Sequence, residues 1–170
     1  MSRYRPPTPP SSPYVTREGY ERLGAERDAL WARRKDVVAA LSAAAAEGDR
    51  SENAEYQYRK RELAGIDRRI RYLQKRLPAL KVIDARAGAD RVFFGAEVVL
   101  ELEAADGALE ERAVHIVGAD EIDPATRRVS VDSPLARALL GRRAGDEGEI
   151  EVEGRPLGWR VLEVRWPGSA

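Results

Sequence analysis

The chain lacks several features on which whole classes of protein depend. It has no cysteine, one histidine and one methionine among 170 residues, and no run of about 18 apolar residues. Without cysteine there is no disulfide scaffold, and His115 alone offers no cluster from which a catalytic triad could be built, so we expect a structural role for it. No charged and then apolar leader is present, so the sequence predicts a cytoplasmic protein with no membrane span.

The formal net charge is zero, but the charges are unevenly distributed. Residues 51–81 carry nine basic and four acidic side chains, whereas residues 82–170 carry eleven basic and eighteen acidic ones. The average therefore conceals a basic part and an acidic part. A chain of this length, 43% hydrophobic, is compatible with one or two small domains and excludes a large single core.

The N-terminal half predicts a tail and a long helix. Five of the ten prolines fall within residues 1–15, which predicts an extended, disordered tail. Thr16 has the position of an N-cap, and a spacing of three and four residues then predicts a helix over about residues 17–47, ended by Gly48 as a left-handed cap. The spaced positions are Tyr20, Leu23, Arg27, Leu30, Arg34, Val37, Leu41 and Ala44, with Trp31 and Val38 available where the seam drifts.

A second helix follows at once and keeps the same spacing. Its seam residues are Tyr56, Arg59, Leu63, Ile66, Ile70, Leu73, Leu77 and Leu80. Pro78 predicts that the last turn kinks or ends early. Because only a few residues separate the helices, they form an antiparallel coiled-coil hairpin over residues 16–81, with each arm on the order of 40 Å long. A two-helix rod buries only one seam per helix, so its length adds little stability. The length is better explained by a need to extend to a distant binding site.

From residue 92 the hydrophobic period changes to two. Residues 92–103, an Asp106-Gly107 turn and residues 113–117 predict a β-hairpin. Further strands are expected at residues 129–131, 149–152 and 159–164, with one helix from Ser133-Pro134 to Gly141. Residues 82–170 are therefore predicted to form an antiparallel sheet domain with one helix, and the fold class is α+β.

The turn between the long helices, residues 47–55, is acidic. It contains Glu47, Asp49, Glu52 and Glu55. One interpretation is a capping box, in which Asp49 caps the second helix and Glu52 reaches back to it. A capping box needs only one such glutamate, however, and an excess of carboxylates at an exposed apex favours a cation. Asp49 and Glu52 together could hold one Mg²⁺ weakly, with most of its water shell intact.

The second helix is strongly basic, with eight basic and two acidic residues between positions 59 and 76. The basic residues are Arg59, Lys60, Arg61, Arg68, Arg69, Arg71, Lys75 and Arg76. Such an imbalance favours phosphate contact, with little sequence preference, over a merely solvated flank. Tyr56, Tyr58 and Tyr72 could stack on bases, although helical spacing favours packing for at least one of them.

Four segments closely resemble the bacterial Gre transcript-cleavage factors. They are residues 48–58, which include Gly-Asp-Arg-Ser-Glu-Asn, and residues 66–73, 92–96 and 132–140. The segments occur in the family's order, and the resemblance covers residues 14 to about 166. Its Arg-Ser-Glu-Asn tip and basic second helix are similar to the GreB branch rather than to GreA. The resemblance implies a finger that enters the secondary channel of RNA polymerase and an FKBP-like C-terminal domain that docks at the channel mouth.

The resemblance also implies roles for particular residues. Asp49 and Glu52 match the family's essential pair, which would help to hold a second Mg²⁺ in the polymerase active centre and position the attacking water. The basic helix would contact the extruded 3′ end of the nascent RNA. Asp132, Ser133 and Pro134 would lie on the docking face, although a plain N-cap with proline at the first helical position explains that motif equally well. The protein would be a monomeric cofactor for cleavage, not an independent nuclease.

Two other function classes stay open. A channel-binding regulator without cleavage activity would use the same rod to block substrates or alter the active centre. A prolyl isomerase or chaperone follows only from analogy of fold, which does not license that activity. The presence of both Asp49 and Glu52 favours the cleavage factor.

Overall fold

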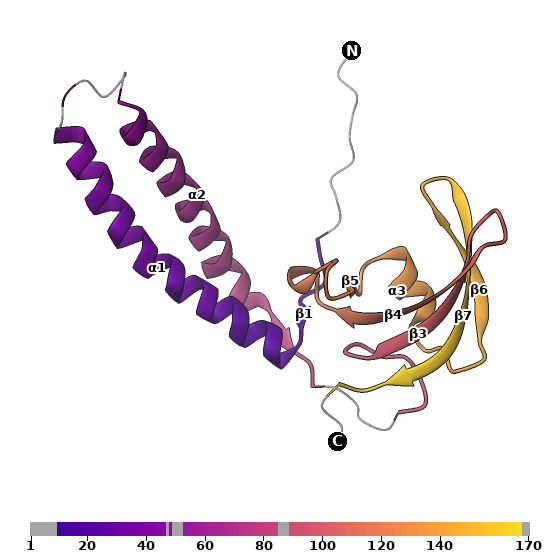
Figure 1. Cartoon of the computed structure of the whole chain (residues 1–170). Helices are drawn as coiled ribbons and strands as arrows, with labels where there is room; N and C mark the ends of the chain where they lie inside the picture. The colour runs from indigo at the N-terminus through magenta and orange to yellow at the C-terminus, as the bar shows by residue number, and fades with distance from the viewer. Residues whose placement is uncertain (1–9, 47, 49–52, 85–88, 168–170) are drawn as a thin grey trace, which may run out of the picture. The chain divides into compact units, whose positions relative to one another are not determined.

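The computed structural model describes residues 10–46, 48, 53–84 and 89–167. The chain forms two compact units, whose main elements are a pair of helices and a curled sheet (Figure 1). The helical unit is Tyr20–Leu80, and the sheet unit is built from the chain on both sides of it. The finger was predicted over residues 16–81, whereas the helical unit begins only at Tyr20. The difference arises because the first turn of the first helix belongs to the sheet unit.

The helical unit contains most of α1 (Arg17–Ala46) and all of α2 (Ala54–Arg76). Val37 packs against Ile66 and Ile70, and Leu30 and Leu63 cover this cluster. The other buried hydrophobic residues in the described part of the two helices and the turn after them are Leu23, Ala44, Leu73 and Leu77. All of these residues lie on the predicted seam, so the antiparallel two-helix arrangement is confirmed.

Three apolar residues of α1 depart from the prediction. Tyr20, Trp31 and Val38 are 37%, 40% and 39% exposed, so Trp31 and Val38 do not substitute in the seam. The early end at Pro78 is confirmed, because α2 stops at Arg76 and a 3₁₀ turn, η1 (Leu77–Ala79), follows it. None of the helices in the described part of the chain combines the length and the apolarity that crossing a membrane requires.

The two ends of α1 differ in how well they were predicted. The Thr16 hydroxyl accepts a hydrogen bond from the Gly19 amide at 3.0 Å, which confirms Thr16 as the N-cap. The helix ends at Ala46, and Gly48 has a φ of +135°. That angle favours glycine but lies far from the φ of about +57° of the left-handed helical region. The end of the helix before Gly48 and the positive φ of that glycine are therefore confirmed, and its backbone differs from an ideal left-handed helical cap.

The sheet unit is built around a five-stranded sheet in the order β5-β4-β3-β7-β6 (Figure 1). In chain order its elements are β3 (Glu97–Glu103), β4 (Leu109–Val117), the 3₁₀ turn η2 (Ala119–Glu121), β5 (Arg128–Ser130), α3 (Pro134–Leu139), β6 (Glu147–Val152) and β7 (Arg155–Arg165). The hairpin of β3 and β4 and the single helix confirm the α+β class. Inward residues of the strands and α3 form one core, which includes Leu100, Ile116, Leu139 and Val161.

Two details of the sheet were predicted wrongly. It is mixed, because β5 runs parallel to β4. Two reversals, η2 and a turn closed by Arg127 N–H and Pro124 O at 3.3 Å, restore the chain direction between these strands. The strand predicted from residue 92 begins only at Glu97, because a turn closed by Ala96 N–H and Phe93 O at 3.1 Å precedes it.

A short parallel pair, β1 (Tyr14–Val15) and β2 (Lys81–Val82), also belongs to the sheet unit. The Lys81 amide donates to Pro13 O at 2.7 Å, and the Ile83 amide donates to Val15 O at 2.9 Å. Val15 is fully buried. The disordered tail predicted over residues 1–15 therefore extends too far, since Tyr14 and Val15 form a strand; residues 1–9 lie outside the described part of the chain.

Candidate functional site: the acidic turn and the basic helix

The acidic turn is described only at its edges. Asp49 and Glu52, the predicted metal ligands, lie outside the described residues. The N-cap of α2 is Asn53, whose Oδ1 accepts a hydrogen bond from the Tyr56 amide at 3.0 Å. A capping box of Asp49 and Glu52 would start the helix four residues earlier, so that interpretation is wrong. Asn53, four residues after the predicted cap, takes that role in the structure.

Asn53 also ties the two helices together. Its Nδ2 donates to the backbone oxygen of Ala44 at 2.9 Å, close to the end of α1. Both polar atoms of the Asn53 side chain are therefore bonded. Its oxygen accepts from a backbone N–H in the first turn of α2, and its nitrogen donates to a backbone carbonyl in the last turn of α1. From its place beside Asp49 and Glu52, Asn53 could be expected to orient water or RNA. Its two hydrogen bonds give it a structural role.

Glu55 is the one carboxylate of the acidic turn that the structure describes. Its carboxylate binds the Arg59 guanidinium at 2.7 Å, one helical turn away. In the described part of the chain, no group of three or more His, Cys, Asp or Glu side chains is arranged to hold a metal ion. The predicted metal ligands, Asp49 and Glu52, are not among the residues to which this finding applies.

Two of the eight basic residues of the second helix serve the hairpin itself. Arg59 bridges Glu55 and Glu62, and the latter also binds Arg33 of α1 at 2.6 Å. The hydrogen bond from Arg33 is the main cause that lowers the pKa of Glu62. Such contacts hold these side chains in the structure, so Arg59 is a poor candidate for binding phosphate.

Arg69 has a similar position on the same side of the hairpin. It binds both oxygens of Glu26, on α1, at 2.6 and 2.8 Å. This pair lowers the pKa of Glu26, chiefly through the hydrogen bonds. Sequence counting could not separate Arg59 and Arg69 from the other cations, because their partners lie on the other helix or one turn away.

Four other cations of α2 form a line on its surface, the basic stripe: Lys60, Arg68, Arg71 and Lys75. All four are exposed, and none has a carboxylate partner among the residues that the structure describes. Spacings of eight, three and four residues keep them within about 80° around the helix, away from the buried seam, over about 22 Å. Arg61 is also exposed, with its Nε on the backbone oxygen of Gln57, and Arg76 is half-buried.

The tyrosines of α2 differ in exposure. Tyr56 is half-buried, whereas Tyr58 and Tyr72 are 54% and 44% exposed. The guanidinium of Arg59 lies 5.3 Å from the Tyr58 ring centre, and that of Arg69 lies 5.2 Å from the Tyr72 ring centre. The expectation that at least one tyrosine packs is confirmed for Tyr56. The rings of Tyr58 and Tyr72 are each already in contact with an arginine.

The predicted docking residues occupy the start of α3. Ser133 is the N-cap, with its hydroxyl accepting from the Ala136 amide at 3.2 Å, and Pro134 is the first helical residue. Asp132 accepts hydrogen bonds from the Ser12 amide at 2.8 Å and from the Ser12 hydroxyl. All three residues therefore have internal structural roles, and Asp132 holds the segment that leads into β1.

A groove that sequence reasoning missed lies beside Ser133. It has a volume of about 550 Å³ and is lined by both apolar side chains and arginines. The apolar lining includes Val114, Ile122, Val129 and Leu135, and the arginines are Arg112, Arg127 and Arg128. Ile122 is 55% exposed, so its side chain is accessible beside the groove. No single segment carries this pattern, because β4, the loop that contains Ile122 and Arg127, β5 and α3 each contribute to it.

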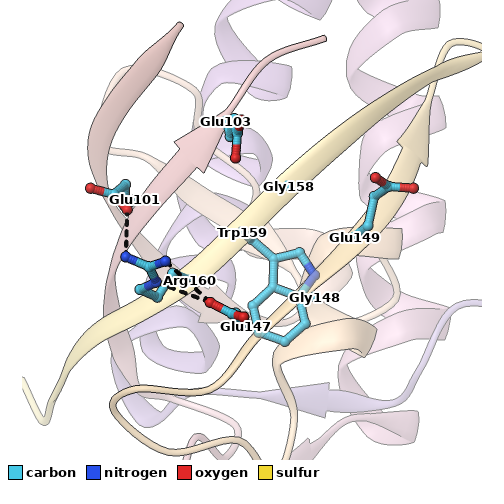
Figure 2. Close-up of a pocket in the computed structure, with 8 residues that line it drawn as sticks. All are labelled: Glu101, Glu103, Glu147, Gly148, Glu149, Gly158, Trp159 and Arg160. Carbon is cyan, nitrogen blue, oxygen red and sulfur yellow. Dashed lines mark hydrogen bonds and ion pairs between the residues drawn. The ribbon is translucent and has the colours of Figure 1, made fainter. Parts of the chain in front are cut away.

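A second hollow, of about 440 Å³, lies on the sheet over β3, β7 and β6 (Figure 2). Arg160 bridges Glu101 and Glu147, at 3.2 Å to each, while Glu103 and Glu149 flank the bare backbone of Gly158. Four carboxylates against one guanidinium repel phosphate, so this face does not fit a nucleic acid.

Comparisons with known proteins agree with the two units. A family model described as "Transcription elongation factor, N-terminal" matches residues 13–82, and one described as "Transcription elongation factor, GreA/GreB, C-term" matches residues 87–165. The transcription elongation factor GreB of Xanthomonas axonopodis pv. citri (strain 306) is 58% identical over 154 residues, 89% of this chain and 90% of that protein. The one of Pseudomonas aeruginosa (strain PAO1) is 49% identical over 169 residues, 98% of each. GreA factor homolog 1 of Thermus thermophilus, a crystal structure, aligns with a TM-score of 0.41 at 25% identity, over 89% of this chain and 97% of that one.

Proposed function

Because the chain belongs to the GreA/GreB family of transcription elongation factors, we propose that it enters the secondary channel of RNA polymerase and stimulates Mg²⁺-dependent cleavage of backtracked nascent RNA. It would rescue arrested complexes in the cytoplasm as a monomeric cofactor, with the polymerase supplying the nuclease activity. The observation that carries this proposal is the basic stripe, a row of exposed cations on the helix that directly follows the acidic turn.

Asp49 and Glu52 supply the chemistry at the turn. Glu55 pairs with Arg59 and Asn53 serves as the cap. Of the remaining carboxylates of the turn, Glu47, Asp49 and Glu52, the last two match the family's essential pair and are hard oxygen ligands of the kind that suits Mg²⁺. Two carboxylates leave several positions of the ion to a partner. In a two-metal site of this kind, one ion would activate water and the other would stabilise the leaving oxygen of a phosphodiester. The role of Asp49 and Glu52 would be to hold and orient one of these ions.

The basic stripe would hold the RNA that leaves the polymerase active centre during backtracking. Its exposed cations suit a phosphate backbone and need no particular base sequence. The internal ion pairs of Arg59 and Arg69 keep the hairpin closed. We therefore assign RNA contact to Lys60, Arg68, Arg71 and Lys75, with Arg61 and Arg76 at the margins.

The sheet unit would dock on the polymerase through the groove beside Ser133. A lining of apolar side chains and arginines resembles the composition of a protein interface. Ile122 and Leu135 would supply the apolar contact. Asp132, Ser133 and Pro134 would act through their structural roles, by shaping the wall of the groove.

A second candidate is a channel regulator without cleavage activity. The same hairpin and the same docking groove would serve it, and no described residue distinguishes the two functions. The Asp49 and Glu52 pair favours cleavage, because a blocking tip needs only bulk and charge.

The deciding experiment is transcript cleavage in a stalled, backtracked elongation complex. Asp49→Asn/Glu52→Gln keeps the shape of both side chains and removes both charges. Cleavage should be lost while binding to polymerase is retained. Glu55→Gln is the matched control, because it removes one carboxylate of the same turn that is already paired with Arg59. If the wild-type protein binds without accelerating cleavage, the regulator replaces the cleavage factor.

A further inference from the structure

Trp31 is an exposed tryptophan on the helical unit. It is 40% exposed, whereas Trp159 and Trp166, in the core of the sheet unit, are 5% and 8% exposed. Tyr20 and Val38 share its surface of α1, since spacings of eleven and seven residues bring all three within about 20° around the helix. We call these three residues the apolar stripe. The exposed part of the Trp31 indole leaves an aromatic surface that a partner could contact.

Three ion pairs show on which side of the hairpin Trp31 lies. Arg34 of α1 binds Asp67 of α2 at 2.7 Å on one flank, whereas Arg33–Glu62 and Arg69–Glu26 join the helices on the other. Trp31 is three residues from Arg34, about 60° around α1. It therefore lies on the flank of the Arg34–Asp67 pair.

The basic stripe borders the same flank. Arg71 is four residues from Asp67, about 40° around α2, and Lys60 is seven residues from it, about 20° around. The hydrogen bond between Asn53 and Ala44 confirms that the helices run antiparallel in this register. Along the helix axes, measured from the Arg34–Asp67 pair in the direction away from the turn, Trp31 lies at about 4.5 Å and Arg71 at about 6 Å. Trp31 and Arg71 thus stand at the same level of the hairpin.

The indole is held in place. The Arg34 guanidinium lies 5.7 Å from the centre of the Trp31 ring, and the same guanidinium is tied to Asp67. This cation–π contact fixes the ring beside a row of cations while leaving much of it open. A flat aromatic surface next to a line of phosphate-binding charges is the arrangement that single-stranded nucleic acids use, because every base has a π face.

We propose that Trp31 is a base-stacking platform for single-stranded RNA whose phosphates lie on the basic stripe. The inference rests on the proposed RNA contact of α2 and adds to it a residue of α1. The apolar stripe and the basic stripe then form one track along one flank of the hairpin. Because stacking on an indole accepts any base, the track binds RNA of any sequence.

The test uses the full chain on backtracked RNA polymerase complexes whose extruded RNA carries 5-iodouridine. Irradiation should cross-link the RNA to Trp31. In cleavage assays, Trp31→Ala should raise the protein concentration for half-maximal cleavage by about tenfold, as expected for the loss of one base stack. Trp31→Phe, which keeps an aromatic ring, should recover most of that loss. Leu162→Ala, a residue of β7 that is 39% exposed, is the control for removing exposed apolar surface.

Each contrary result has a distinct meaning. If RNA cross-links to α2 but not to Trp31, and Trp31→Ala cleaves like wild type, the platform is refuted while the proposed RNA contact stands. If Trp31→Ala weakens binding to polymerase that carries no RNA, Trp31 contacts protein and the inference is wrong. If the wild-type protein stimulates no cleavage, the proposed function fails, and the cross-link in the bound complex still decides the role of Trp31.

Discussion

The carboxylate of Glu121 occupies the space that a side chain at Gly19 would need, since a Cβ on Gly19 would overlap its Oε1. Glu121 is only 1% exposed. It accepts hydrogen bonds from the amides of Thr16 and Gly118 at 3.0 and 2.9 Å, and from the Thr16 hydroxyl. A buried carboxylate therefore satisfies one amide at the start of α1, where the helix dipole also favours negative charge, and one at the start of η2.

Gly19→Ala should destabilise the sheet unit. The added methyl group would displace the Glu121 carboxylate from the amides that it satisfies, at a cost of about 1–3 kcal/mol. Gly24→Ala is the control on the same helix, because its Cβ position is open, and it should be neutral or stabilising by up to about 1 kcal/mol. Urea unfolding followed by tryptophan fluorescence measures both. Equal effects of the two substitutions would contradict the proposed overlap.

Asn53→Ala should weaken the turn end of the hairpin. The change removes the cap on the Tyr56 amide and the bond to Ala44 O, with an expected loss of about 1–2 kcal/mol. Asn53→Asp keeps an oxygen for the Tyr56 amide but loses the donor to Ala44, so its effect should be intermediate. Hydrogen exchange at the Tyr56 amide is the measurement. Unchanged protection in Asn53→Ala would show that the cap contributes nothing there.

Neutralising the basic stripe should change the salt dependence of RNA contact. For Lys60→Gln/Arg71→Gln, the half-maximal concentration for cleavage should depend less steeply on KCl, by about 0.7 in log–log slope for each phosphate that the protein no longer neutralises. Arg69→Gln is the matched control, because Arg69 is held by Glu26. It should leave the slope unchanged and lower hairpin stability instead. A slope that falls equally in both proteins would contradict the division between structural and RNA-binding cations.

His115 should titrate below the usual range of histidine. Its Nε2 lies 3.2 Å from the Gly95 backbone oxygen; burial is the main cause that lowers its pKa from 6.5, and the nearby Arg128 lowers it further, against Glu97 and Glu121. Because the chain has a single histidine, its ring-proton resonance reports this pKa without ambiguity. Arg128→Gln should raise the pKa, whereas Arg127→Gln, at the neighbouring position, should have little effect.

The same shift predicts how stability depends on pH. A histidine whose folded pKa is lowered binds fewer protons in the folded state, so stability is complete above the unfolded pKa of about 6.5 and is lost as pH falls from there toward the folded pKa. His115→Gln should remove this part of the pH dependence. If wild type and His115→Gln lose stability in parallel between pH 7.5 and 5.5, other groups are responsible.

The seam of the hairpin was predictable because it depends on local spacing. Residues three and four apart share a face of any helix, so Leu23, Val37, Ile66 and Ile70 could be recognised as buried before their partners were known. The same reasoning could not tell Trp31 from a seam residue. Its position differs from that of Leu30 by one residue, and only the placement of the opposing helix decides which of the two is covered.

The sequence by itself determined the two long helices, the change to a period of two at the sheet, the excess of carboxylates in the turn and the excess of cations in the second helix. These are local properties, set by the order of side chains along one element. The tertiary structure decided that Asn53 caps α2, that β5 runs parallel to β4 and that Glu121 fills the space beside Gly19. It also divided the cations of α2. Arg59 and Arg69 bind carboxylates, whereas none among the described residues is bound by Lys60, Arg68, Arg71 or Lys75. Each of these depends on which segments meet across the fold, and a charge or a cap acquires its role only from the group that it meets there.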